Sequence, residues 1–316
     1  MNFVPDDDLR ALQSAIERLV AAHPAMPLDG ARHGYAAALD RQLEEGGFFE
    51  TLQVEGLGRV GAASMIIELS RSPLCVEMVA SSLLRPRFFA GLPRPCAVLW
   101  DDPARPARFL PVARSAVLVS GDGVRAADLP PGCVAELDSV FAYPMGRLKE
   151  PPSLHWRTLD VDAAALRDHW QVGIAAEITG CLAAALQSVV EHVKLRRQFG
   201  RPLGAFQAIQ HRLAEAATAI EAARWLTLRA AWSCDPLDAS MALAHAQHHA
   251  GSIVYDLHQF MGATGLTLEH PLHRWTYRVR LLRSELGGAE RQFAATARAA
   301  WSVPVRSDSG AGTGAA

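Results

Sequence analysis

The sequence after residue 162 has helical periodicity almost throughout, and this constrains the fold more than any other feature. Apolar residues recur at three- and four-residue steps from residue 163 to 197, namely at Leu166, Trp170, Ile174, Ile178, Leu182, Leu186 and Val190. Breaks at RQFGRPLG, CDPLD and GATG separate this helix from three others, expected over residues 205–233, 238–261 and 271–301. Long helices with short connections pack antiparallel, so we predict a C-terminal four-helix bundle over residues 162–302.

The rest of the chain divides into three further parts. Residues 1–91 are mostly helical in pattern, and three aspartates at residues 6–8 suit the start of a first helix. Between residues 92 and 161 prolines cluster and short β-prone segments appear (CAVLW, SAVLVS, CVAEL, HWRTLD). We therefore predict a mainly α protein with an N-terminal helical domain and a reduced antiparallel β region. Residues 303–316 are mostly small and polar, which predicts a disordered tail.

Composition excludes several classes of protein. Half of the 316 residues are hydrophobic and a fifth are charged, as in globular proteins, and the net charge of −2 creates no field that attracts nucleic acid or an anionic membrane. The five cysteines form no C-x-x-C pair, which suits a reducing cytoplasm. The N-terminus MNFVPDDDLRALQ has no secretory signal, and no run of about 18 uncharged apolar residues occurs, so we expect no membrane span.

Two other motifs point to no chemistry. Gly56, Gly58 and Gly61 have the spacing of a dinucleotide-binding turn, but a helical segment rather than a compact strand unit precedes them, so we interpret them as a loop. His245, His248 and His249 share one predicted helix without a further ligand, so we predict a packed or solvated helix face and no metal site. Trp225 and Trp232, two turns apart on one helix, are expected in the core.

The segment KLRRQFGRPLGAFQAIQ resembles the acyl-CoA dehydrogenase family, whose third domain carries R-x-x-F-G followed by F-Q-x-x-Q. A second family element, Q-x-x-G-G, is matched at Gln259 and Gly262, with Ala263 where the second glycine usually lies. The order of helices, β region and helical bundle is also similar to the family's order. The glycines of VEGLGRVG resemble a turn that the family places between two helices of its first domain.

The resemblance implies FAD as cofactor. In the family these elements contact the adenine and pyrophosphate end of an FAD that the neighbouring subunit mainly binds. The residues implied here are Arg196, Gln198, Phe199, Gln207, Gln259, Gly262 and Ala263. Physical chemistry agrees in part, since Arg196 offers a charged fork to a pyrophosphate and Gly262 allows close backbone approach. Arg196 could equally cap its own helix end, and Gly262 could be an ordinary helix stop.

The β region departs from the family pattern. It is much shorter than the family's middle domain, and it lacks a clear W-x-T/S segment for the flavin; LHWRTLD is the nearest and lies at the wrong end. We therefore expect that the chain does not enclose the isoalloxazine ring by itself.

The catalytic base is the second departure. The family usually takes it from the last long helix, where the matching position is Leu286, with Glu285 one residue early. One residue on a helix is a rotation of about 100°, which would turn Glu285 away. Some members use the first bundle helix instead, near Trp170, and Glu177 lies about two turns further on. Glu177 stands among apolar residues and must find a buried partner or stay protonated, so we favour a structural glutamate paired with an arginine or with a helix end. Glu285 remains the candidate catalytic residue.

These observations lead to one main hypothesis and two alternatives. The main hypothesis is the smaller, degenerate subunit of a heteromeric FAD-dependent acyl-CoA dehydrogenase, in an α2β2 heterotetramer of the cytoplasm. The resemblance implies a larger dehydrogenase subunit, an acyl-CoA from fatty acid or steroid side-chain catabolism, and electron transfer flavoprotein as partners. The first alternative is a self-sufficient homo-oligomeric dehydrogenase with Glu285 or Glu177 as base. The second is a structural helical subunit without flavin.

Overall fold

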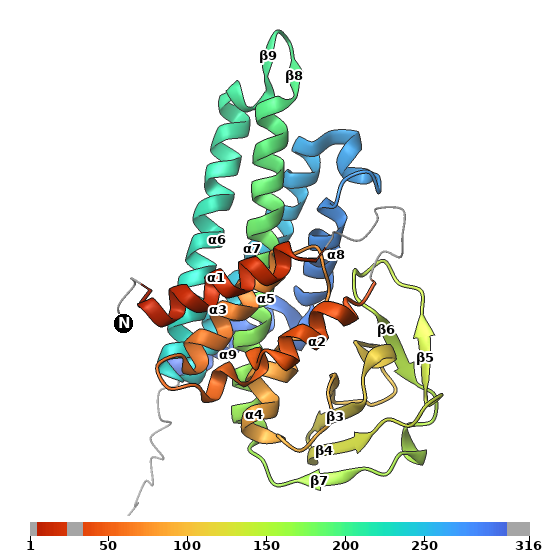
Figure 1. Ribbon diagram of the computed structural model, residues 1–316. Helices are drawn as coiled ribbons and strands as arrows, with labels where there is room; N and C mark the ends of the chain where they lie inside the picture. Colours follow the sequence, from red (N-terminus) through yellow and green to blue (C-terminus); the bar gives the residue numbers. More distant parts are fainter. Residues whose placement is uncertain (1–4, 24–33, 302–316) are drawn as a thin grey trace, which may run out of the picture.

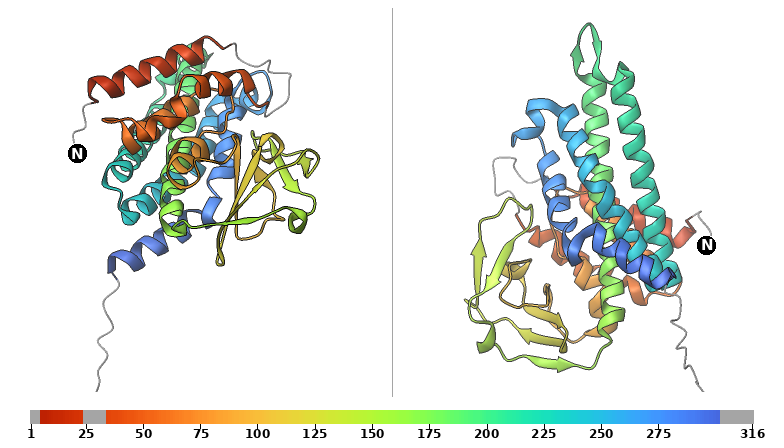
Figure 2. Two further views of the ribbon diagram at one scale, coloured as in Figure 1. Left: turned by 60° about the horizontal axis from the view of Figure 1, so that its bottom comes forward. Right: turned by 180° about the vertical axis from the view of Figure 1, so that it is seen from behind.

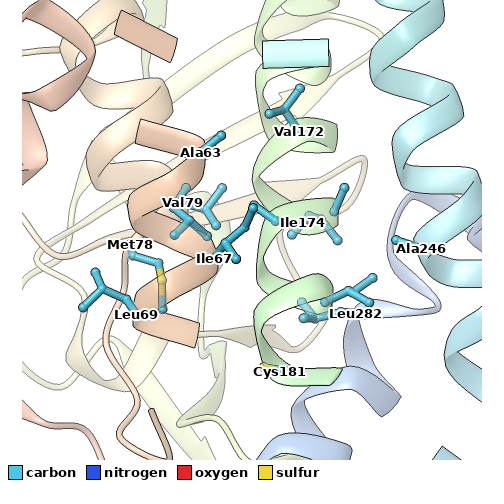
Figure 3. Close-up of a cluster of buried hydrophobic side chains, with 14 of the residues drawn as sticks. Ala63, Ile67, Leu69, Met78, Val79, Val172, Ile174, Cys181, Ala246 and Leu282 are labelled. Carbon is cyan, nitrogen blue, oxygen red and sulfur yellow. The ribbon is translucent and has the colours of Figure 1, made fainter. Parts of the chain in front are cut away.

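The long helix α5 (Ala163–Leu195) lies at the centre of the structure (Figure 1). It begins where the Asp162 side chain accepts a hydrogen bond from the Ala164 backbone N–H, at 2.8 Å. In the computed structural model, which describes residues 5–23 and 34–301, α5 packs against helices from both halves of the chain. Figure 3 shows Ile67 and Val79 on one side of α5 and Ala246 and Leu282 on the other. The core is therefore shared between the N-terminal helices and the bundle.

By length and composition α5 could cross a membrane, although no such span was expected from the sequence. However, 72% of its most apolar window is buried inside the protein. Close packing explains part of this burial: a Cβ placed on Gly180 would lie 2.1 Å from the Ile67 carbonyl oxygen of the crossing helix. The apolar character of α5 is therefore that of a core helix.

The C-terminal bundle is completed by α6 (Gln207–Ser233), α7 (Pro236–Met261), α8 (Leu272–Leu282) and α9 (Gly288–Trp301). Helices α5, α6 and α7 alternate in direction, as the two views in Figure 2 show. Trp232 was expected in the core, but its side chain is 58% exposed. The predicted tail over residues 303–316 lies outside the described residues.

The expected continuous last helix is wrong. The chain leaves the helix at η7 (Glu285–Gly287), where Leu286 has φ 54° and ψ 23° and the next two glycines also have positive φ. Two glycines make this left-handed path inexpensive. Buried glutamines replace the lost helical hydrogen bonds: Gln247 donates to the Leu282 and Glu285 carbonyl oxygens, and Gln292 donates to the Leu286 carbonyl oxygen.

The N-terminal helices are α1 (Asp7–Ala21), α2 (Ala37–Glu45), η1 (Phe48–Gln53), α3 (Gly58–Ser70), η2 (Ala80–Leu84) and α4 (Arg85–Phe88). Asp6 caps the first of them, as the sequence predicted, by accepting a hydrogen bond from the Leu9 N–H at 2.9 Å. Gly56 and Gly58, with φ of 84° and 51°, form the turn between η1 and α3. The glycine-rich motif is therefore a turn between helices, as we interpreted it.

The β region forms two small sheets beside the bundle (Figure 2). One sheet has the order β1 (Cys96–Trp100), β3 (Ser115–Ser120), β4 (Gly123–Asp128) and β7 (Arg157–Leu159). The other has the order β2 (Ala107–Arg108), β6 (Met145–Leu148) and β5 (Val134–Leu137). The β1–β3 pair is parallel, so the region is mixed rather than purely antiparallel. The connection between these strands contributes β2 to the second sheet and so places Arg108.

Candidate functional site

The buried guanidinium of Arg108 joins the β region to the bundle. Its Nη1 donates a hydrogen bond to Glu177 Oε2 at 2.6 Å, and its Nε lies 3.1 Å from Glu285 Oε1. The Tyr143 hydroxyl donates to the other oxygen of Glu177 at 2.7 Å. Glu177 is only 1% exposed. The interpretation of Glu177 as a structural glutamate paired with an arginine is confirmed, and the sequence had identified neither Arg108 nor Tyr143.

Glu285 reaches the same cluster because the last helix is broken. Its Oε2 accepts a hydrogen bond from Trp170 Nε1 at 2.8 Å, so it faces α5 and does not turn away. The rotation argument from sequence was wrong because it assumed an unbroken helix through Leu286. Leu286 itself packs at the edge of the core.

Burial and charge pairing both change the pKa values of the groups in this cluster. Burial raises the pKa of the Glu285 carboxyl, against the opposing effect of Arg108. Burial disfavours the charged form of Arg108, yet the carboxylates of Glu177 and Glu285 raise its pKa above the ordinary value. Burial also raises the pKa of the Tyr143 hydroxyl, so it remains a donor. One guanidinium therefore serves two carboxylates, both of which are already hydrogen-bonded in the resting structure.

The seven residues implied as FAD contacts lie elsewhere, at the end of the bundle marked by the β8–β9 hairpin in Figure 1. Arg196 ends α5, and Gln198 and Phe199 form the hairpin of β8 (Arg197–Gln198) and β9 (Arg201–Pro202). Gln207 begins α6. The remaining three residues lie at the end of α7 and in η6 (Gly262–Leu266); they are Gln259, Gly262 and Ala263. All seven side chains or backbones are exposed, and Phe199 reaches 87%.

These residues fall into two groups. Gln259 and Gly262 line a cavity of about 590 Å³ between α7 and α8, whereas the other five residues do not line it. Gly262 has φ 65° and ψ −146°, and nothing lies within 4 Å of where its Cβ would be. This open backbone fits close approach by a nucleotide. The region beside Trp170, where the β region meets the bundle, is different. There the Cζ atom of Arg108 lies over the Trp170 ring, 5.1 Å from its centroid.

The three histidines of α7 pack against one another and their neighbours. The His245 ring hydrogen-bonds with the Ala219 carbonyl oxygen at 3.0 Å and stacks on His249 at 4.5 Å. The His248 ring contacts Phe293 edge-on at 5.6 Å. Among the described residues, no group of histidine, cysteine or acidic side chains has the arrangement of a metal site.

His169, next to Trp170, is a buried histidine held in one tautomer. Its Nδ1 lies 2.8 Å from the Ala165 carbonyl oxygen, so Nδ1 carries the proton and Nε2 accepts from Arg59 Nη1 at 3.4 Å. Burial, with a further contribution from Arg59, lowers the pKa of His169 to about 4. The imidazole is therefore neutral at neutral pH.

Comparison with known proteins gives a consistent picture. Residues 166–301 match the family model described as the C-terminal domain of acyl-CoA dehydrogenase. Benzylmalonyl-CoA dehydrogenase of Aromatoleum aromaticum is 40% identical over 113 residues, which are 33% of this chain and 30% of that protein. The chain thus matches less than a third of the length of that curated relative.

Two solved structures share the fold at low sequence identity. A chain of the ChsE4-ChsE5 complex from Mycobacterium tuberculosis superposes with a TM-score of 0.79 at 21% identity, covering 96% of this chain and 100% of that one. A chain of the Tcur3481-Tcur3483 steroid ACAD superposes with a TM-score of 0.76 at 21% identity, covering 92% and 96%. The likeness extends over the whole described chain, including the β region.

Replacing Arg108 tests the buried cluster. Arg108→Met leaves the Glu177 and Glu285 carboxylates without their cation, and we expect a loss of about 3–5 kcal/mol in the free energy of unfolding. Urea unfolding at pH 7 measures this loss. The control is Arg105→Met, which removes an exposed guanidinium from the same loop. An Arg108 variant as stable as the control would show that the cluster does not hold the two parts together.

The low pKa of His169 predicts a pH dependence of stability. The unfolded chain binds a proton near pH 6.5 and the folded chain only near pH 4, so stability present at pH 7 is lost as the pH falls through this window. We expect His169 to account for about 3 kcal/mol of this loss, and His169→Gln to remove that part. Urea unfolding at pH 7 and 4.5 measures it, with exposed His155→Gln as control. Equal pH slopes in all three proteins would contradict the prediction.

Proposed function

Because the chain belongs to the acyl-CoA dehydrogenase family, we propose that it is the smaller subunit of a heteromeric, FAD-dependent acyl-CoA dehydrogenase. In this proposal the partner subunit encloses the flavin ring and supplies the catalytic base. This chain supplies contacts to the dinucleotide end of the flavin, through residues at the hairpin end of its bundle. The complex dehydrogenates an acyl-CoA thioester between its α and β carbons.

The observation that carries the proposal is the contrast between the two regions. The dinucleotide-end residues are exposed, as expected of groups that complete a site on another subunit. Glu177 and Glu285 are instead both bound to Arg108. The reaction needs a carboxylate free to take the α proton of the thioester, while FAD, when bound, accepts the hydride from the β carbon. Both oxygens of Glu177 contact Arg108 and Tyr143, and both oxygens of Glu285 contact Arg108 and Trp170, so neither carboxylate presents a free oxygen to a substrate.

The structural neighbours support the heteromeric part of the proposal. The first of them is the ChsE4-ChsE5 complex, and the second is the Tcur3481-Tcur3483 steroid ACAD. By analogy we propose an α2β2 assembly with a longer dehydrogenase subunit and a bulky acyl-CoA substrate, such as a steroid side-chain or fatty acyl thioester. Reoxidation by electron transfer flavoprotein and a cytoplasmic location are part of the same proposal.

Flavin retention tests the contribution of this chain. The chain is purified alone and after co-expression with a full-length dehydrogenase homologue encoded beside it, and the bound flavin is measured by visible absorption. We expect a colourless lone chain and a yellow heteromer. Arg196→Ala removes the permanent charge at the end of α5, and we expect the heteromer to lose flavin about tenfold more readily. Arg18→Ala, an exposed arginine on α1, is the control. Unchanged flavin content in the Arg196 variant would remove its pyrophosphate role.

A self-sufficient enzyme with Glu285 as base is the second candidate, because Glu285 faces α5 at Trp170. This places it beside the helix position from which some family members take their base. Under this candidate Glu285→Gln reduces turnover at least about 10²-fold, the usual contribution of a general base, in a yellow lone chain that an acyl-CoA bleaches. Under the main proposal the same variant leaves the turnover of the heteromer unchanged. Single-turnover bleaching of the flavin, followed by absorption, distinguishes the two.

A further inference from the structure

The cavity between α7 and α8 carries an excess of positive charge on apolar walls. Val254, Tyr255 and Leu266 contribute apolar and aromatic surface, and the Tyr255 side chain is 69% exposed. Arg280 of α8 and Arg283, the residue that directly follows α8 in helical conformation, line the same cavity. Side chains three residues apart on a helix share one face, so the two guanidinium groups lie on the same side of α8.

Neither Arg280 nor Arg283 has an acidic partner in the part of the chain that the structure describes. Asp256, the acidic residue of α7 nearest in sequence to the cavity wall, is already bound to Arg212 of α6 at 2.8 Å. Two cations beside an apolar wall form a site that is complementary to an anion with an apolar or ring-shaped part.

A glycine of α7 makes room for one of these cations. A Cβ on Gly251 would lie 3.1 Å from Arg283 Nη1 and 3.4 Å from both its Cζ and Nη2. The guanidinium of Arg283 therefore lies against bare helix backbone, which holds it at the cavity wall. A side chain at residue 251 would require this guanidinium to shift by a few tenths of an ångström.

We propose that Arg280 and Arg283 bind the diphosphate of the nucleotide whose site includes Gln259 and Gly262. The inference rests on the proposed function. It assigns the diphosphate to two residues that the family motifs do not contain, in place of Arg196, which does not line this cavity. Two guanidinium groups match the two negative charges of a diphosphate, and each can donate paired hydrogen bonds to phosphate oxygens. The open backbone at Gly262 permits close approach, and the exposed Tyr255 ring offers a face on which a base can stack.

The test compares ADP with adenosine as probes on the flavin-depleted heteromer. We expect the double variant Arg280→Gln, Arg283→Gln to bind ADP at least about tenfold more weakly, and adenosine as the wild type does, because only the phosphate contacts are lost. Isothermal titration calorimetry measures both affinities. The matched control is Arg41→Gln, an exposed arginine on α2.

Gly251→Ala provides a second test that does not remove a charge. The added methyl group displaces the flexible end of Arg283, while alanine favours the helix over glycine by about 1 kcal/mol. We expect a variant at least as stable as the wild type that binds ADP several-fold more weakly. Weaker binding with undiminished stability separates displacement of Arg283 from a general loss of structure.

The outcomes also separate this inference from the proposed function. A wild-type heteromer that retains no FAD and binds no ADP would overturn the proposed function and the inference together. A wild-type heteromer that binds both, with the double variant binding ADP equally well, would overturn the inference alone. A double variant that no longer assembles with its partner would show that the arginines dock an acidic segment of that subunit, and would also overturn the nucleotide assignment.

Discussion

The salt-bridged cluster around Arg108 is the interaction on which the arrangement of the two halves depends. A guanidinium from a two-residue strand reaches a carboxylate in the middle of the central helix and a second carboxylate at the break before α9. Removing charges from water is costly, and the ion pairs of Arg108 with Glu177 and Glu285 offset this cost, although Arg108 Nε and Nη2 form no hydrogen bond among the described residues. The cluster therefore fixes the β region, α5 and the segment after α8 relative to one another.

The exposed end of the bundle contrasts with this buried cluster. A family fold that keeps its dinucleotide-end residues at the surface, while its candidate base is bound internally, has the features expected of a subunit that completes another's site. The hairpin with Phe199 and the cavity between α7 and α8 extend from the same rigid helices. Their positions are set by the packing of α5, α6 and α7, so this surface has a fixed shape.

Local pattern determined the parts of the fold that the sequence predicted well. The helices α5, α6 and α7 follow from apolar spacing, the cap of α1 follows from Asp6, and the glycine turn follows from its helical surroundings. The motif residues Arg196 and Gln259 were identified because the other residues of each family motif follow them within a few positions of the sequence. Such signals need only the residues within a few turns of each other.

Tertiary structure alone decided the break after α8 and the membership of the buried cluster. The break around Leu286 is stabilised by Gln292 from the next helix and by Gln247, which lies 35 and 38 residues from its two acceptors, and no spacing rule indicates them. Arg108 meets Glu177 across 69 residues, and Glu285 meets Trp170 across 115. The sequence alone determined which segments are helical and which family they resemble. It did not determine which charges are paired, because pairing depends on distances that exist only after the helices and the β region have packed together.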